Sequence, residues 1–230
     1  MLQIIALFAF SWLIIWWHEK GNLSVLGFQP TLKRTGYFFL LLFVSILISA
    51  STYLLRMYFA EEQYTVNTSM NAQLFFQESW FQIRSVLTEE LLCRGVLLYI
   101  MIRQLGTRKA IVLSSLIFAL LHWFNSGVWG NLPQMAMVFV FTFAMGLLLA
   151  YAFTQSKSIL LPFGIHLGWN WVQNFVFPDN AAAHSVFVLV TPPPTVTISY
   201  LAFFTMLLFP KIAVLAINYG IVRSYKSADS

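Results

Sequence analysis

Charged residues are scarce in this chain of 230 residues. There are 13 Lys and Arg and 8 Asp and Glu, so 9% of the residues are charged, whereas an average soluble domain has about 25%. Hydrophobic residues make up 59% of the sequence, and a soluble domain of this length has too little interior to bury them. The composition excludes a soluble enzyme, a coiled coil and a disordered chain, and it predicts an integral membrane protein.

Cysteine is almost absent as well, because Cys93 is the only one. A single cysteine excludes an intrachain disulfide and a zinc site made of several cysteines. The sequence also lacks linkers, repeats and low-complexity runs, so we expect one integral membrane domain over residues 1–230. The net charge is +5, but the basic residues are scattered through short loops. This indicates membrane topology and no nucleic-acid partner.

Long apolar runs account for most of the chain. A bilayer core of about 30 Å requires roughly 20 apolar residues in a helix. Seven segments meet this length or nearly do: Met1–Trp17, Tyr37–Phe59, Arg84–Arg103, Ala110–Phe124, Pro133–Phe153, Ile159–Phe177 and Val196–Ile217. We therefore expect an all-α, polytopic protein with about seven transmembrane helices, and a first helix that is retained because it lacks signal-peptide features.

Basic residues gather in alternate loops between these segments. One side carries Lys20, Lys33, Arg34, Arg103, Arg108, Lys109, Lys157, Arg223 and Lys226, and the other carries Glu61, Glu62, Glu78 and Asp179. Cytoplasmic loops of membrane proteins have an excess of Lys and Arg. The pattern predicts a plasma membrane protein of bacterial type with its N-terminus outside and its C-terminus in the cytoplasm, in contact with membrane lipid.

Three charged residues interrupt the third apolar segment, and ionisable groups inside a membrane indicate function by default. Glu90 and Arg94 are four residues apart with the acid first, which is the favourable order for an ion pair on one helix face. Glu89 is about 100° further round the helix, so it is free to act as a general acid or base. The alternative is that Glu90 and Arg94 only hold helices together.

Histidines mark two further segments. Phe118 and His122 are four residues apart, as are His166 and Asn170, so each pair shares a helix face. Counted from the basic residue at the end of each helix, Glu89, His122 and Asn170 all lie at a depth of about 20 Å, and His166 lies one turn shallower. Because packing residues have no reason to coincide in depth, we expect one polar site inside the membrane.

These three motifs, Glu89-Glu90-x-x-x-Arg94, Phe118-x-x-x-His122 and His166-x-x-x-Asn170, resemble those of the CAAX protease and bacteriocin-processing (CPBP, or Abi) family. That family includes the type II CAAX prenyl endopeptidases. The order of the motifs matches, and the resemblance covers about residues 80–178.

The resemblance implies peptide-bond hydrolysis within the membrane, without a covalent intermediate, on a peptide or lipid-modified protein substrate. It implies that Glu89 and His122 activate a water, that His166 and Asn170 stabilise the oxyanion, and that Glu90, Arg94 and Phe118 support the site. Ser114 and Ser115 offer a serine nucleophile as a weaker alternative, two turns from His122.

Two questions stay open at this stage. Glu89, His122 and His166 can supply three ligands to a divalent metal, with zinc the best match, but the helical H-E-x-x-H signature is absent, and we expect no cofactor. The site also suits a non-catalytic immunity or scaffold protein, or a proton-conducting transporter. Complete motifs argue against a scaffold, and the absence of internal repeats argues against a transporter.

Overall fold

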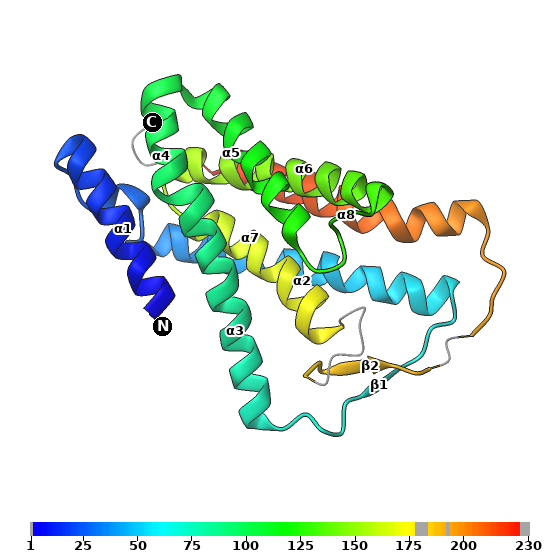
Figure 1. The fold of residues 1–230 in the computed structure, drawn as a ribbon. Helices are drawn as coiled ribbons and strands as arrows, with labels where there is room; N and C mark the ends of the chain where they lie inside the picture. The colour runs from blue at the N-terminus through cyan, green and yellow to red at the C-terminus, as the bar shows by residue number, and fades with distance from the viewer. Residues whose placement is uncertain (1, 178–183, 192–193, 226–230) are drawn as a thin grey trace.

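The computed structural model describes residues 2–177, 184–191 and 194–225, and most of them are helical (Figure 1). The α-helices are α1 (Leu2–Glu19), α2 (Leu32–Phe59), α3 (Ala72–Glu90), α4 (Leu97–Leu105), α5 (Thr107–Leu121), α6 (Leu132–Ser156), α7 (Leu160–Trp171) and α8 (Tyr200–Arg223). Short 3-10 turns lie at Leu23–Leu26 and His122–Phe124, and π-helical turns lie at Leu91–Val96 and Val172–Val176.

Two short strands add to the predicted all-α fold. Strands β1 (Tyr64–Val66) and β2 (Phe187–Leu189) pair in an antiparallel sheet in which Thr65 is opposite Val188. This small sheet joins the connection between α2 and α3 to the segment before α8, below the helices in Figure 1.

Among the described residues, four helices are long and apolar enough to cross a membrane: Leu32–Phe59, Thr107–Phe124, Leu132–Ser156 and Tyr200–Arg223. A shorter apolar helix spans Ile4–Glu19. Their outward faces carry large apolar side chains in contact with the surroundings, including Phe43 and Leu47 on α2 and Phe209 and Ile212 on α8. The protein is thus an integral membrane protein, but the predicted count of seven crossings exceeds the spans that length and composition support.

The predicted third and sixth segments differ from single straight helices. The helix expected at Arg84–Arg103 begins earlier, at Ala72, and bends in the π-helical turn, where Gly95 leaves helical geometry with φ −76° and ψ −124°. The helix expected at Ile159–Phe177 changes to a π-helical turn after Trp171. Single-turn π-bulges occur frequently at functional sites, and both of these follow glutamates or histidines of the predicted motifs.

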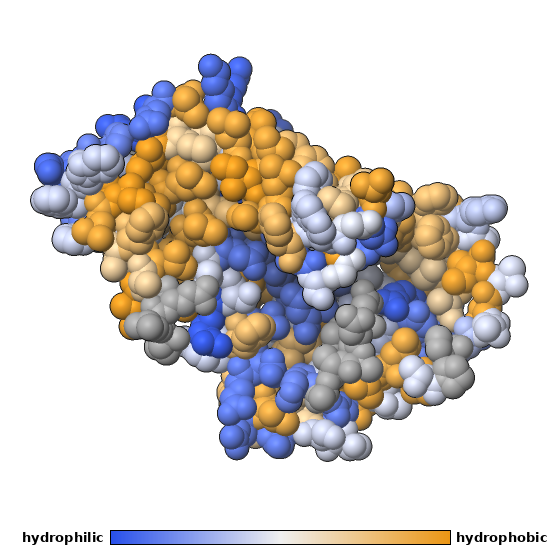
Figure 2. Space-filling model, viewed as in Figure 1, coloured by the Kyte–Doolittle hydropathy of each residue, from blue (hydrophilic) through white to orange (hydrophobic). Residues whose placement is uncertain are grey.

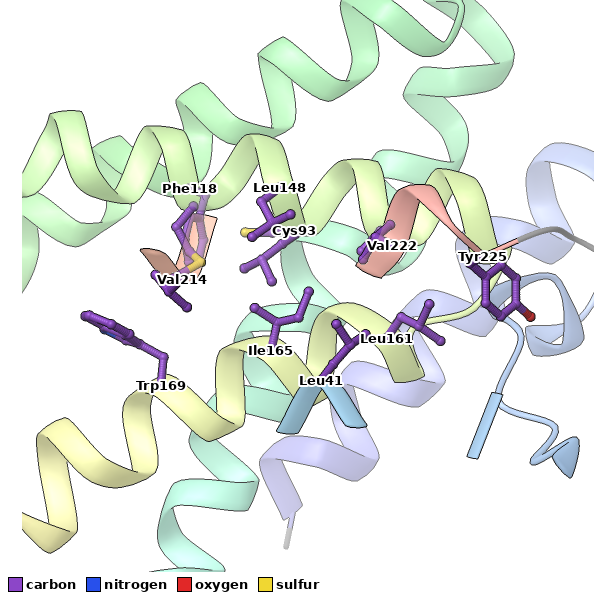
Figure 3. Close-up of a cluster of buried hydrophobic side chains, with 13 residues drawn as sticks. Leu41, Cys93, Phe118, Leu148, Leu161, Ile165, Trp169, Val214, Val222 and Tyr225 are labelled. Carbon is purple, nitrogen blue, oxygen red and sulfur yellow. The ribbon is translucent and has the colours of Figure 1, made fainter. Parts of the chain in front are cut away.

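The core lies between α6 and α7. Figure 3 shows side chains from five helices and the bend after α3 meeting there: Leu41, Cys93, Phe118, Leu148, Leu161, Ile165, Trp169, Val214, Val222 and Tyr225. All of these are at most 8% exposed. Because they fill the space between α6 and α7, they fix the position of the polar motifs on α3, α5 and α7.

Two glycines let α7 lie unusually close to α2. A Cβ atom on Gly164 would come within 2.8 Å of the Phe38 carbonyl oxygen, and one on Gly168 within 2.5 Å of the Leu42 carbonyl oxygen. Small residues four apart allow this kind of backbone approach between membrane helices. His166 stands two residues from each glycine, about 200° round the helix, so the close contact with α2 turns His166 towards α3 and α5.

The basic residues assigned to one side of the membrane lie at one end of the helices. Arg34, at the start of α2, donates to the carbonyl oxygen of Lys157 after α6 (3.4 Å), and Arg103 of α4 pairs with Glu19 of α1 (2.8 Å). Lys33 lies over the ring of Tyr225, just beyond α8. Asp179 and Lys226 are outside the described residues. The grouping of the charges agrees with the sequence, and which face is cytoplasmic stays a prediction.

Candidate active site

The motif residues meet where α3, α5 and α7 come together. Glu89 and Glu90 are the last residues of α3, His122 ends α5 at the start of a 3-10 turn, and His166 and Asn170 lie on α7. Figure 2 shows hydrophilic surface in a hollow between α3 and the connection from α5 to α6. The surface above this hollow is largely apolar.

Glu90, Arg94 and His166 form a buried charged cluster. The Glu90 Oε1 atom accepts from Arg94 Nη1 at 3.0 Å and from His166 Nδ1 at 2.7 Å, and both Glu90 and Arg94 have fully buried side chains. The sequence predicted the ion pair between Glu90 and Arg94 but not the contact to His166. This second contact fixes the ring of His166 and makes Glu90 a part of the site.

Phe118 packs against three of the polar groups. The guanidinium carbon of Arg94 lies 3.8 Å from the centre of the Phe118 ring, a cation–π contact. The His122 and His166 rings meet the same ring edge to face, with centroid separations of 4.3 and 5.6 Å. Phe118 therefore contacts Arg94 and both imidazoles, and it supports the positions of the two rings.

Glu89 faces the two histidines without a hydrogen bond. Its Oε2 atom lies 3.8 Å from His122 Nε2 and 3.7 Å from His166 Nε2, beyond hydrogen-bonding distance, and it has no partner among the described residues. The side chain is 33% exposed, whereas the neighbouring Glu90 is fully buried. The carboxylate is partly exposed, but this Oε2 atom is enclosed by the protein and faces the two imidazole nitrogens.

The hydrogen bonds of each imidazole indicate where its proton lies. His122 Nδ1 is 2.8 Å from the Phe118 carbonyl oxygen, which can only accept, so Nδ1 donates and Nε2 keeps a lone pair. His166 Nδ1 donates to Glu90, and its Nε2 accepts from Asn170 Nδ2 at 3.1 Å. The lone pair of His122 thus remains available beside Glu89, and that of His166 is occupied by Asn170.

The other nucleophilic side chains near the site are engaged elsewhere. Ser114 donates to the Cys93 carbonyl oxygen at 2.9 Å, and Ser115 donates to the Ile111 carbonyl oxygen at 2.7 Å. Both serines are fully buried, and burial raises the cost of ionising the equally buried Cys93. None of the three is placed to attack a substrate.

The site does not provide a ready metal centre. In the described part of the chain, no group of three or more His, Cys, Asp and Glu side chains is arranged to hold a metal ion. Glu89 and His122 have free donor atoms, but the Nε2 lone pair of His166 already accepts the Asn170 amide. A catalytic zinc site has three protein ligands in addition to water, so the arrangement does not fit one.

The fold and the site define a membrane protein with a partly exposed glutamate–histidine centre. A family model, described as Type II CAAX prenyl endopeptidase Rce1-like, matches residues 71–172. Over this stretch, which runs from the start of α3 to the end of α7, the chain is similar to the Rce1-like family, and the resemblance predicted from the motifs is confirmed. No curated protein and no solved structure matches the chain.

The match covers every predicted site residue and leaves out α1, α2 and α8. The matched range starts before residue 80 and ends before residue 178, which were the limits predicted from the motifs. At the level of the family it implies a protease of the CAAX type that acts in a membrane on prenylated substrates.

Proposed function

We propose that this protein is an intramembrane endopeptidase that hydrolyses a peptide bond in a prenylated peptide or protein, with a water molecule activated by Glu89 and His122. The observation that carries the proposal is that His122 Nε2 and His166 Nε2 both lie within 4 Å of Glu89 Oε2, beside a hydrophilic hollow.

In this mechanism the water donates one hydrogen to Glu89 and the other to His122. Both groups can accept, because Glu89 Oε2 has no partner and His122 carries its proton on Nδ1. A water held by two acceptors directs an oxygen lone pair away from both, towards the substrate carbonyl. As the carbon–oxygen bond forms, Glu89 takes the proton, and it returns this proton to the leaving amine when the carbon–nitrogen bond breaks.

Asn170 and His166 serve the oxyanion. One amide hydrogen of Asn170 goes to His166, and the second is free to donate to the developing charge. His166 supports this donor by accepting the other amide hydrogen on Nε2, while the Glu90 carboxylate at 2.7 Å holds its Nδ1–H. Donors preorganised at a developing charge commonly contribute the largest share of catalysis.

Glu90, Arg94 and Phe118 hold this arrangement in shape. Arg94 neutralises Glu90, Glu90 fixes His166, and Phe118 supports the rings of both histidines. The mechanism uses no metal, because the engaged lone pair of His166 supports the metal-free alternative.

A purified sample reconstituted in lipid nanodiscs tests the proposal with two matched peptides, one farnesylated on a cysteine near its C-terminus and one unmodified. We expect mass spectrometry to find a single cut in the farnesylated peptide, and no cut by the Glu89→Gln variant. The exposed Glu61 supplies the control Glu61→Gln, which should cut like the wild type. Binding of the farnesylated peptide without any cleavage by the wild type would instead favour the scaffold alternative.

A further inference from the structure

A buried glutamine continues the polar surface of the site along α3. Gln82 is 5% exposed, and it lies on the inward face of α3 together with Val86 and Glu90, at spacings of four residues. Among the described residues its side-chain amide has no hydrogen-bond partner. One turn away, the buried Ser79 hydroxyl has none either. Buried polar groups are nearly always paired, so the unpaired Ser79 hydroxyl, together with a nearly buried amide that bonds to no described protein group on the same helix face, points to a ligand.

Gln82 lies beside α7 at the level of Asn170 or just beyond it. The contacts between the two helices run from Glu90 with His166 to Phe75 with Phe175, whose ring centres are 5.4 Å apart. Gln82 stands between Phe75 and Glu90 on α3, and Asn170 stands between His166 and Phe175 on the opposite helix. The order of these contacts therefore places Gln82 at about the same level along the helices as Asn170, which we assign to the oxyanion.

The distance from Glu89 sets what this amide can reach. Gln82 and Glu89 are seven residues apart, which is two helical turns on nearly the same face and about 10 Å along the axis. An extended peptide advances about 3.3 Å per residue. A substrate with its scissile carbonyl at Glu89 and its chain along α3 thus brings the third residue from that bond to Gln82.

We infer that Gln82 binds the main chain of the substrate about three residues from the cleaved bond and sets how the peptide lies along α3. The inference rests on the proposed function and extends it from the reacting atoms to the peptide-binding surface. A glutamine amide both donates and accepts, so it can pair with a peptide N–H and C=O together, as an extended main chain presents them.

The test uses a panel of farnesylated peptides in which each main-chain amide in turn is N-methylated. For the wild type we expect N-methylation of the third residue from the cut to lower kcat/KM. The Gln82→Leu variant should cut the unmodified peptide about three- to tenfold more slowly, as expected for one lost hydrogen bond, and should show no further loss with the methylated peptide. Its melting temperature should not fall, because the lost amide had no partner in the protein.

The exposed Gln77 on the same helix provides the matched control Gln77→Leu, which should keep the wild-type profile. Identical N-methylation profiles for wild type and Gln82→Leu would overturn the inference, as would equal falls in activity and melting temperature. Binding of the same peptides to Glu89→Gln separates the two proposals. Weaker binding on adding Gln82→Leu to this background supports the role of Gln82 even if the wild type cuts nothing, and unchanged binding overturns it.

Discussion

Helix α7 has two polar faces that differ in how completely they are paired. Towards α2, Ser49 donates to the Trp169 carbonyl oxygen, and the Gln173 amide donates to Ser49 and accepts from Tyr53, each at 3.0 Å. Towards α3 and α5, the Glu89 and Glu90 Oε2 atoms have no partner in the part of the chain that the structure describes.

The difference separates a structural network from a reactive one. A fully paired buried network rigidifies a core, whereas a buried polar atom without a partner carries a cost. The face towards α2 holds α7 at close range, with the help of Gly164 and Gly168. The face towards α3 includes the Glu89 Oε2 atom, which the proposed mechanism assigns to water.

Substitutions of the adjacent residues Glu89 and Glu90 should give the largest contrast in activity and melting temperature. Glu89→Gln removes the proposed base and should lower kcat by about 10²–10⁴-fold, the usual contribution of general acid–base catalysis, with an unchanged melting temperature because Glu89 is partly exposed and unpaired. Glu90→Gln should lower the melting temperature as well, since it removes a carboxylate paired with both Arg94 and His166. Enzyme assays and thermal unfolding in detergent measure both. Substantial cleavage by the pure Glu89→Gln variant would show that Glu89 is not the general base.

Arg94 should matter more for folding than for chemistry. Arg94→Ala leaves Glu90 buried and half paired, and the loss of one partner of a buried ion pair typically costs about 3–5 kcal/mol. We expect a marked fall in the melting temperature and in the yield of folded protein. Arg103→Ala is the control, because the pair of Arg103 with Glu19 is 61% exposed on the arginine side and should contribute little. An Arg94→Ala variant that melts like the wild type but is inactive would place Arg94 in the catalytic machinery.

Much of this site could be predicted from spacing alone. The four-residue intervals put Glu90 with Arg94, Phe118 with His122 and His166 with Asn170, and local helix geometry fixes such pairs. Counting residues from the basic end of each helix also placed polar residues of three helices at a similar depth, and the structure brings these polar groups together.

Other features depend on contacts that no local pattern contains. The bond from His166 to Glu90 joins residues 76 apart in sequence, and the hydrophobic pattern gives no signal for it. The bends after Glu90 and Trp171 were missed because π-helical turns share the composition of the helices around them. Gln82 had a weak signal, a polar residue seven before Glu89 on the same face, but its lack of a partner is visible only in three dimensions.

Two glutamines on opposite sides of α7 should respond differently to the same substitution. Gln173→Leu removes the hydrogen bonds that the Gln173 amide makes with Ser49 and Tyr53, and this loss should cost about 1–3 kcal/mol. Gln82→Leu strands no group and should not destabilise the protein. Thermal unfolding of the two variants side by side measures the contrast. Equal destabilisation would mean that both faces are structural.

The smallest expected effect is that of removing metal. A zinc centre on Glu89, His122 and His166 would need the Nε2 lone pair of His166, which accepts the Asn170 amide in this arrangement. In the proposed mechanism the same atom holds the Asn170 amide that serves the oxyanion, and Glu89 activates water directly. We therefore expect exhaustive chelation, followed by elemental analysis, to leave kcat/KM unchanged in a sample with far less than one metal per chain.

Asn170→Ala provides a sharper test, because it frees the His166 lone pair. It should lower the rate by about 10²–10³-fold through loss of a donor without creating a zinc-dependent enzyme. One zinc per chain in the wild type, lost together with activity and restored with it, would show that the lone pair of His166 turns from Asn170 to the metal, and that the reactive face of α7 is completed by an ion.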